Sequence, residues 1–215
     1  MALSQRKRSE LERREQDILA SAMVLFDGDD WPSVTMDQIA ARADVSKGTL
    51  YNHFASKDDI YARLLIDFSE QVLDRLEHLA PQAEPEGGVR EILAVLWDAY
   101  RDNPHFRRIS YYGDREGFRT GLSAPLRKRI GLLDQRFLAL TSKVLQRGVD
   151  AGRFRNAPVA ELHLGLRFVL AGLSRVVWSA EVSAAEDDAL FGSISAFVLA
   201  GLGASAQVIA AGRED

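Results

Sequence analysis

Helical spacing of apolar residues is the feature that most limits how this chain can fold. Apolar side chains recur three or four positions apart along almost the whole sequence, and no segment sustains the strict alternation typical of strands. The clearest stripe runs from Ile60 to Leu79, where most of these side chains stand four positions apart. Such spacing gives each helix one apolar face to bury against its neighbours. The sequence therefore predicts an all-α protein.

Composition excludes several classes of site. The 215 residues include no cysteine, which removes thiolate catalysis, disulfide bonds and cysteine-based zinc sites. The four histidines show no metal-ligand spacing, and the glycines near residue 201 lack both the spacing and the preceding strand of a dinucleotide-binding loop. The net charge is -4, but cations cluster near the N-terminus, and phosphate contacts depend on where cations lie. We therefore expect no enzyme activity, no metal and no cofactor.

Neither end of the sequence favours a membrane or secreted protein. The first 20 residues are basic and lack an apolar core of signal-peptide length. Residues 192–211 carry no charge, but serines, glycines and one glutamine dilute their hydropathy, so a helix packed against another helix is the preferred interpretation. The absence of cysteine is compatible with a reducing compartment, and the expected location is the cytoplasm.

Capping and turn signals divide the sequence into helices. Thr35 with Gln38, and Ser56 with Asp59, have the spacing of capping boxes. Pro125 stands where the first turn of a helix tolerates proline. Two short helices are expected to begin near residues 35 and 46, and longer ones to span about residues 9–26, 57–79, 89–102, 125–150, 159–180 and 187–210. Pro104 begins a short piece over residues 104–118. We expect an N-terminal three-helix domain, residues 1–56, and a larger helical domain, residues 57–215.

The short helix beginning at Ser46 carries residues that a core helix would avoid. Gly48 in its first turn costs about 1 kcal/mol relative to alanine. Its polar side chains are Lys47, Thr49, Tyr51, Asn52 and His53. In a helix-turn-helix the second helix enters the DNA major groove with its N-terminal residues leading, and a glycine there permits close approach to the DNA or to the bracing helix. The residues at 51–53 can then reach the flanking backbone, while Leu50 and Phe54 point to the core.

The segment "VTMDQIAARADVSKGTLYNHFASKDDIYARLL" resembles the DNA-binding domain of the TetR family of transcriptional regulators. Its pattern is Ile-Ala-x-x-Ala, then Val-Ser-x-Gly-Thr-Leu-Tyr-x-His-Phe, then Lys, over about the first quarter of the chain. The resemblance implies a helix-turn-helix domain that binds double-stranded DNA, followed by a helical domain for effector binding and dimerisation. It also implies a repressor that a small-molecule effector releases from its operator.

The same resemblance implies residue roles. Thr35 would cap the bracing helix and touch phosphate. Ser46, Lys47, Gly48 and Thr49 would face the groove, and Tyr51, His53 and Lys57 would clamp phosphates. One position departs from the family pattern, because Asp44 occupies the inter-helix turn where glycine is usual. Aspartate visits the left-handed backbone region more readily than most residues, so we expect the turn to survive with mild strain and an added negative charge near the DNA.

The larger domain offers candidates for an effector pocket. The residues expected to line it are Trp97, Tyr100, Phe106, Tyr111, Tyr112, Phe137, His163 and Phe168. Each aromatic has a plainer interpretation as core. For His163, an ordinary hydrogen-bonded core histidine is the preferred interpretation. Residues 105–119 form a dense charged patch, either solvated ion pairs or the site of one arginine that holds an anionic effector.

The last two helices, residues 159–180 and 187–210, are the expected homodimer surface. Both carry apolar residues on more than one face, and glycines at 165, 172, 201 and 203 with Ala204 permit close helix approach. One chain alone would leave that apolar area exposed, which marks an interface. A twofold dimer predicts a near-palindromic operator with half-sites about 34 Å apart.

Regulation is expected to follow from a population shift between two arrangements, with the helix over residues 57–79 belonging to both domains. Two other classes stay open. One is an effector-independent DNA-binding regulator, either an activator or a nucleoid-type binder. The other is a helical enzyme with a DNA-binding head.

Overall fold

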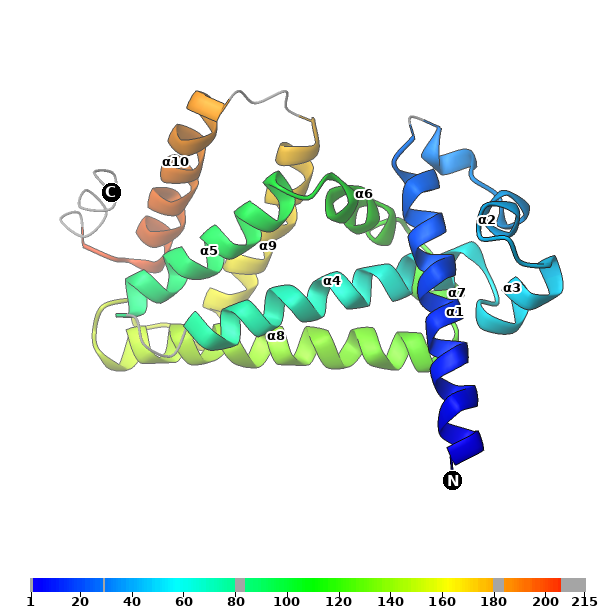
Figure 1. Cartoon of the computed structure of the whole chain (residues 1–215). Coiled ribbons are helices and arrows are strands. Elements are labelled where there is room, and N and C mark those ends of the chain that lie inside the picture. Colours follow the sequence, from blue (N-terminus) through cyan, green and yellow to red (C-terminus); the bar gives the residue numbers. More distant parts are fainter. Residues whose placement is uncertain (1, 29, 80–83, 180–183, 206–215) are drawn as a thin grey trace. The chain divides into compact units, whose positions relative to one another are not determined.

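The structure is a computed structural model that describes residues 2–28, 30–79, 84–179 and 184–205 (Figure 1). Its elements are α1 (Ala2–Phe26), η1 (Trp31–Ser33), α2 (Met36–Arg42), α3 (Lys47–His53), α4 (Lys57–Leu79), α5 (Pro85–Arg101), α6 (Pro104–Gly113), α7 (Phe118–Gly121), α8 (Ala124–Asp150), α9 (Val159–Ser179) and α10 (Ala184–Leu202). Every regular element in these ranges is helical, which confirms the all-α prediction.

The chain forms two compact units. The first contains residues up to Asp67 together with Pro104–Ile130, and the second contains residues 68–103 and those from 131 onward. Helices α4 and α8 each contribute residues to both units. The first unit therefore holds α6 and α7 as well as the three N-terminal helices. The functional division expected between residues 56 and 57 stays a prediction.

A stack of aromatic rings forms the core of the first unit. Phe26 of α1 stacks on Tyr61 of α4 with ring centroids 4.0 Å apart, and Tyr61 stacks on Tyr112 of α6 at 3.7 Å. Phe118 of α7 meets Tyr112 edge-on at 5.8 Å. All four rings are buried, and burial raises the pKa of the Tyr61 hydroxyl, with the neighbouring Tyr112 adding to the shift. Buried aromatics contribute large apolar areas, so this stack ties four helices into one unit.

Two of the predicted helix caps are confirmed. Thr35 Oγ1 accepts a hydrogen bond from the Gln38 N–H at 3.3 Å, and Gln38 Oε1 accepts one from the Thr35 N–H at 2.8 Å. Ser46 Oγ accepts from the Thr49 N–H at 3.0 Å. Each bond satisfies an N–H group that the first turn of a helix leaves without a backbone partner. These caps fix where α2 and α3 begin.

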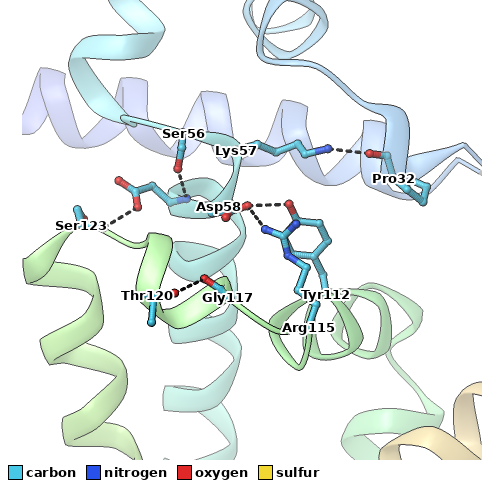
Figure 2. Close-up of polar contacts among 10 residues, drawn as sticks. Pro32, Ser56, Lys57, Asp58, Tyr112, Arg115, Gly117, Thr120 and Ser123 are labelled. Carbon is cyan, nitrogen blue, oxygen red and sulfur yellow. Dashed lines mark hydrogen bonds and ion pairs between the residues drawn. The ribbon is translucent and has the colours of Figure 1, made fainter.

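The capping box predicted at Ser56 forms only in part (Figure 2). Ser56 Oγ accepts from the Asp59 N–H at 3.2 Å, as expected. The Asp59 carboxylate, however, accepts from the backbone N–H of Ser123 at 3.1 Å. Asp59 is buried. Because its carboxylate accepts from Ser123, it joins the first turn of α4 to the residue before α8.

The second unit buries Trp97 of α5 and His163 of α9. The partly buried side chains packed against Trp97 are Tyr100, Leu170, Leu190, Phe191 and Ile194. The Thr141 hydroxyl lies 2.8 Å from the Phe137 carbonyl oxygen, to which it donates, and 2.9 Å from His163 Nδ1. Burial lowers the pKa of His163, and the nearby positive charge of Arg167 lowers it further. These groups place His163 in a hydrogen-bonded core setting.

Helix α10 ends earlier than the sequence pattern suggested. The expected end was residue 210, but α10 ends at Leu202. Gly203 adopts a left-handed conformation with φ of 85°, and the Ala204 N–H donates to the Leu199 carbonyl at 3.0 Å. This is a glycine C-terminal cap. Residues 206–210 lie outside the described chain. Across the helices that the structure describes, none has the length and hydropathy required to cross a membrane.

Candidate nucleic-acid interface

Helix α3 is anchored by one face and projects the other. Leu50 and the following Phe54 are buried, as are Ile39 and Ala40 of α2. The Val45 N–H donates to the Ala40 carbonyl at 3.0 Å and closes the turn between the helices. The remaining residues of this segment are exposed or partly exposed: Ser46, Lys47, Gly48, Thr49, Tyr51, Asn52 and His53. These seven predicted site residues, which are distributed around the short helix, form its accessible surface.

The leading end of α3 is organised by hydrogen bonds. The hydroxyls of Ser46 and Thr49 lie 2.8 Å apart, within hydrogen-bonding distance. The Lys47 ammonium lies 2.8 Å from one carboxylate oxygen of Asp37 and donates to the other at 3.0 Å. This hydrogen bond and the negative charge of Asp37 raise the pKa of Lys47. Both partners are exposed, so a phosphate can compete for Lys47 at small cost.

Gly48 lies in open space with respect to the described residues. A Cβ atom built on Gly48 would meet only Ser46 Oγ, at 3.9 Å, which is ordinary van der Waals distance. No atom of the bracing helix α2 lies within 4 Å of that position. Of the two reasons for a glycine here, close approach to the bracing helix is therefore excluded. Close approach to something outside the chain remains.

Asp44 adopts the strained conformation that its place in the turn predicted. Its φ is 52°, and it is the one non-glycine residue with positive φ in the described part of the chain. Its N–H donates to the Ala41 carbonyl at 3.3 Å, and its side chain is exposed. The turn between α2 and α3 keeps its geometry despite the substitution for glycine.

Lys57 makes a hydrogen bond within the first unit. Its ammonium donates to the Pro32 carbonyl at 2.7 Å, and the side chain is only partly exposed (Figure 2). Burial lowers the pKa of Lys57, and the positive charge of Arg115 lowers it further, while Asp58 opposes the shift. A phosphate role for Lys57 therefore requires that a phosphate compete with this internal acceptor.

The first turn of α4 is held by residues that sequence reasoning did not assign. Asp58 accepts hydrogen bonds from the Tyr112 hydroxyl at 2.7 Å and from the Arg115 guanidinium (Figure 2). The guanidinium also lies 4.0 Å from the centroid of the Tyr112 ring. No local signal could have found these contacts, because an aspartate after a helix start is already explained by the helix dipole. Asp37, which pairs with Lys47, was missed for the same reason.

The predicted effector residues are divided between the two units, and their common role stays a prediction. Phe106, Tyr111 and Tyr112 belong to the first unit, whereas Trp97, Tyr100, Phe137, His163 and Phe168 belong to the second. Tyr112 is occupied by the aromatic stack and by Asp58, and Tyr111 is 47% exposed. Phe168 is 72% exposed on α9 and therefore lines no interior of its unit.

The charged patch at residues 105–119 is partly used within the first unit. Arg108 donates to the Asp27 carbonyl at 2.6 Å, just beyond the end of α1, and pairs with the Asp27 carboxylate. Arg115 pairs with Asp58. Both arginines therefore hold the unit together. Among the residues that the structure describes, no group of histidine or acidic side chains could hold a metal ion.

Comparisons with known proteins agree with this geometry. Residues 18–64 match the model of bacterial regulatory proteins of the tetR family. The chain is 24% identical over 146 residues to the HTH-type transcriptional repressor NicS of Pseudomonas putida, covering 67% of this chain and 68% of that protein. A tetR-family regulatory protein from Rhodococcus shares the fold with a TM-score of 0.71 at 17% identity, over 89% of this chain and 98% of that one. The transcriptional regulator FadR from Bacillus subtilis, solved in complex with stearoyl-CoA, shares it with a TM-score of 0.68 at 16% identity, over 86% and 98%.

The matched segment contains α2, α3 and the turn between them, and it includes the exposed residues of α3 described above. The proteins named here are regulators of transcription. Residues 18–64 thus form a DNA-binding domain of the TetR type, and the rest of the chain has the helical fold of TetR-family regulators.

Proposed function

We propose that the chain is a homodimeric repressor whose α3 enters the major groove of its operator, and that an effector releases it. The observation that carries the proposal is the exposed face of α3, where Gly48 leaves open space above a polar surface. The major groove is about 12 Å wide, so a helix that enters it must be slim at its leading end. Acting on chromosomal DNA, such a regulator would work in the cytoplasm.

The polar residues of α3 take roles that their positions support. Ser46, Lys47 and Thr49 lie at the leading end, where N–H groups and the helix dipole favour phosphate. On binding, the Lys47 ammonium exchanges the Asp37 carboxylate for a DNA phosphate. Thr35, whose N–H is already hydrogen-bonded to Gln38, contacts the neighbouring DNA backbone. Residues 51–53 reach the flanking phosphates from further along the helix.

Asp44 is expected to limit both stability and DNA affinity. Asp44→Gly should raise the free energy of unfolding by up to about 1 kcal/mol, because glycine adopts positive φ without the Cβ penalty. It should also tighten DNA binding severalfold by removing a negative charge from the exposed turn. Asp44→Asn separates the two effects, since it removes the charge and keeps the side chain. Urea denaturation and DNA titration measure them, and an Asn variant that binds like the parent would exclude the charge effect.

Lys57→Ala is expected to weaken binding to all DNA sequences alike. The loss of one phosphate contact should lower the slope of log affinity against log salt by about one. The variant should also lose some thermal stability, because the ammonium no longer anchors the Pro32 carbonyl. Lys128→Ala, at an exposed lysine on α8 of the same unit, is the control. If only stability changes and the salt slope does not, Lys57 is structural and contacts no phosphate.

The dimer forms through the exposed faces of α9 and α10. Leu164, Phe168 and Phe197 are 50%, 72% and 71% exposed, an unusual concentration of bare apolar surface. Between the two helices lies a groove of about 140 Å³ whose lining includes Gly165, Gly201 and Phe197. Cβ atoms on either glycine would meet nothing within 4 Å, so both leave room for a partner. Gly203 has a different role, since it caps α10 and lies against Arg155.

The effector binds in the second unit beside Trp97. This side chain is 3% exposed, yet its indole N–H has no hydrogen-bond partner among the residues that the structure describes. Within the same residues, the buried Ser195 hydroxyl of α10 also lacks one. Unpaired buried donors are costly, and a ligand that supplies an acceptor relieves that cost. The ligand chemistry that fits is an apolar molecule carrying a carbonyl, carboxylate or phenol oxygen.

Release from DNA tests the regulatory part of the proposal. With a binding site in hand, a panel of such compounds is screened for loss of the protein–DNA complex, and direct binding is measured by calorimetry. The expected result is release by at least one compound that also binds the free protein. A protein that binds its site and responds to none of them would favour the effector-independent regulator. Increased transcription on binding would favour an activator.

A further inference from the structure

The first turns of α1 extend beyond the packed part of the first unit. Residues 5–14 are all exposed, and the first buried residue of the helix is Ile18. Ten helical residues span about 15 Å. Most helical stability in proteins comes from packing one face against neighbours, and this segment has no such face. Its sequence is therefore not explained by the core of the unit.

This segment is rich in cations. The five basic residues are Arg6, Lys7, Arg8, Arg13 and Arg14, against the two carboxylates of Glu10 and Glu12. Arg8 lies 3.8 Å from Glu12 in an exposed ion pair. The other four cations and Glu10 make no ion pair within the described chain, and we call these four cations the basic arm.

The helix presents the basic arm as a strip. Seven residues make almost two turns, so Arg6 and Arg13 share one side, and Lys7 and Arg14 share the adjacent side. The strip covers about 12 Å along the axis. Glu10 lies within it, between the two pairs. A single carboxylate among four cations leaves a surface that suits an extended polyanion.

Two facts connect the basic arm to DNA. The arm belongs to the same compact unit as α3. The family match begins at residue 18, where burial also begins, so the arm lies outside the matched segment. We propose that the basic arm binds phosphates of the duplex beside the half-site that α3 reads. This inference rests on the proposed DNA-binding function.

The test is the salt dependence of binding to a duplex of random sequence. Each phosphate contact contributes about 0.9 to the slope of log affinity against log salt between about 50 and 200 mM KCl. Replacing all four cations by glutamine, which preserves helix propensity, should lower the slope by about 2 to 4. Affinity at the low-salt end should fall at least tenfold, and circular dichroism should show an unchanged thermal midpoint.

Two further variants control for net charge. Lys128→Gln with Lys143→Gln removes two exposed cations from α8 and should change the slope by less than one unit. Glu10→Gln should act in the opposite direction and strengthen binding, because it removes the carboxylate from the strip. An unchanged slope in the four-residue variant, with DNA binding intact in the parent, overturns this inference and leaves the α3 proposal standing. Failure of the parent to bind any duplex overturns the α3 proposal instead. The same four-residue variant is also tested for binding to vesicles of anionic lipid. If the four substitutions weaken binding to the vesicles and not to DNA, the arm binds membranes, and the inference of DNA binding is overturned.

Discussion

Gly48→Ala is expected to weaken operator binding by about 100-fold, or about 2.7 kcal/mol, while the protein becomes slightly more stable. Within the chain the new methyl group meets only Ser46 Oγ at 3.9 Å, so folding has nothing to lose. Alanine is favoured over glycine in a helix by up to about 1 kcal/mol, so the unfolding midpoint should rise. At the groove surface the same methyl group overpacks a close contact, which typically costs about 1–3 kcal/mol.

The combination of gain and loss is what identifies Gly48 as a contact residue. Gly131→Ala provides the matched control, because a Cβ there meets nothing within 4 Å and the residue lies inside α8. It should raise stability in a similar way and leave DNA affinity unchanged. Fluorescence anisotropy and thermal unfolding, measured on the same preparations, give both quantities. A Gly48→Ala variant that binds DNA with the affinity of the parent would contradict the proposal that α3 enters the major groove.

Phe168→Asp is expected to convert the dimer into monomers. Burying a phenylalanine contributes about 1.5–3 kcal/mol, and twofold symmetry counts each side chain twice. The dimer dissociation constant should therefore rise by roughly 10² to 10⁴-fold, with a further rise when Phe197→Asp is added. Sedimentation over a range of concentrations measures this shift. DNA binding should weaken in parallel, because a monomer engages one half-site at a time.

Leu132→Asp is the matched control for the dimer surface. Leu132 is 51% exposed on α8, so it carries the same kind of change outside α9 and α10. The dimer should persist in this variant. Dissociation caused equally by both substitutions, or a Phe168→Asp protein that sediments as the parent does, would contradict the proposed interface.

Local signals predicted the fold and the exposed face of α3 well. The caps at Thr35 and Ser46 depend on residues three positions apart, which a sequence displays directly. The left-handed conformation of Asp44 followed from its place in the turn. Periodicity likewise predicted every long helix, because the apolar residues that recur at helical spacing are the ones that the helix buries.

Contacts between distant residues were beyond local signals. The Asp59 carboxylate binds the N–H of Ser123, and Asp58 binds Tyr112, each more than fifty positions away. Lys57 was expected to bind phosphate, and its hydrogen bond to the carbonyl of Pro32 could not be predicted from the sequence. Phe168, which the sequence suggested for a pocket, is 72% exposed on α9, because aromatic identity alone does not reveal which side of a helix faces solvent. Such pairings depend on how helices meet in space, which no single-sequence pattern encodes.

Selection from a pool of random duplex DNA tests the central claim most directly. With the purified full-length protein as bait, the pool should converge on a near-palindromic site whose half-sites lie about 34 Å apart, or another whole-turn spacing. The same selection with the Gly48→Ala protein should show little or no convergence. A parent protein that enriches no sequence at modest ionic strength would contradict the assignment of α3 as a DNA-reading helix.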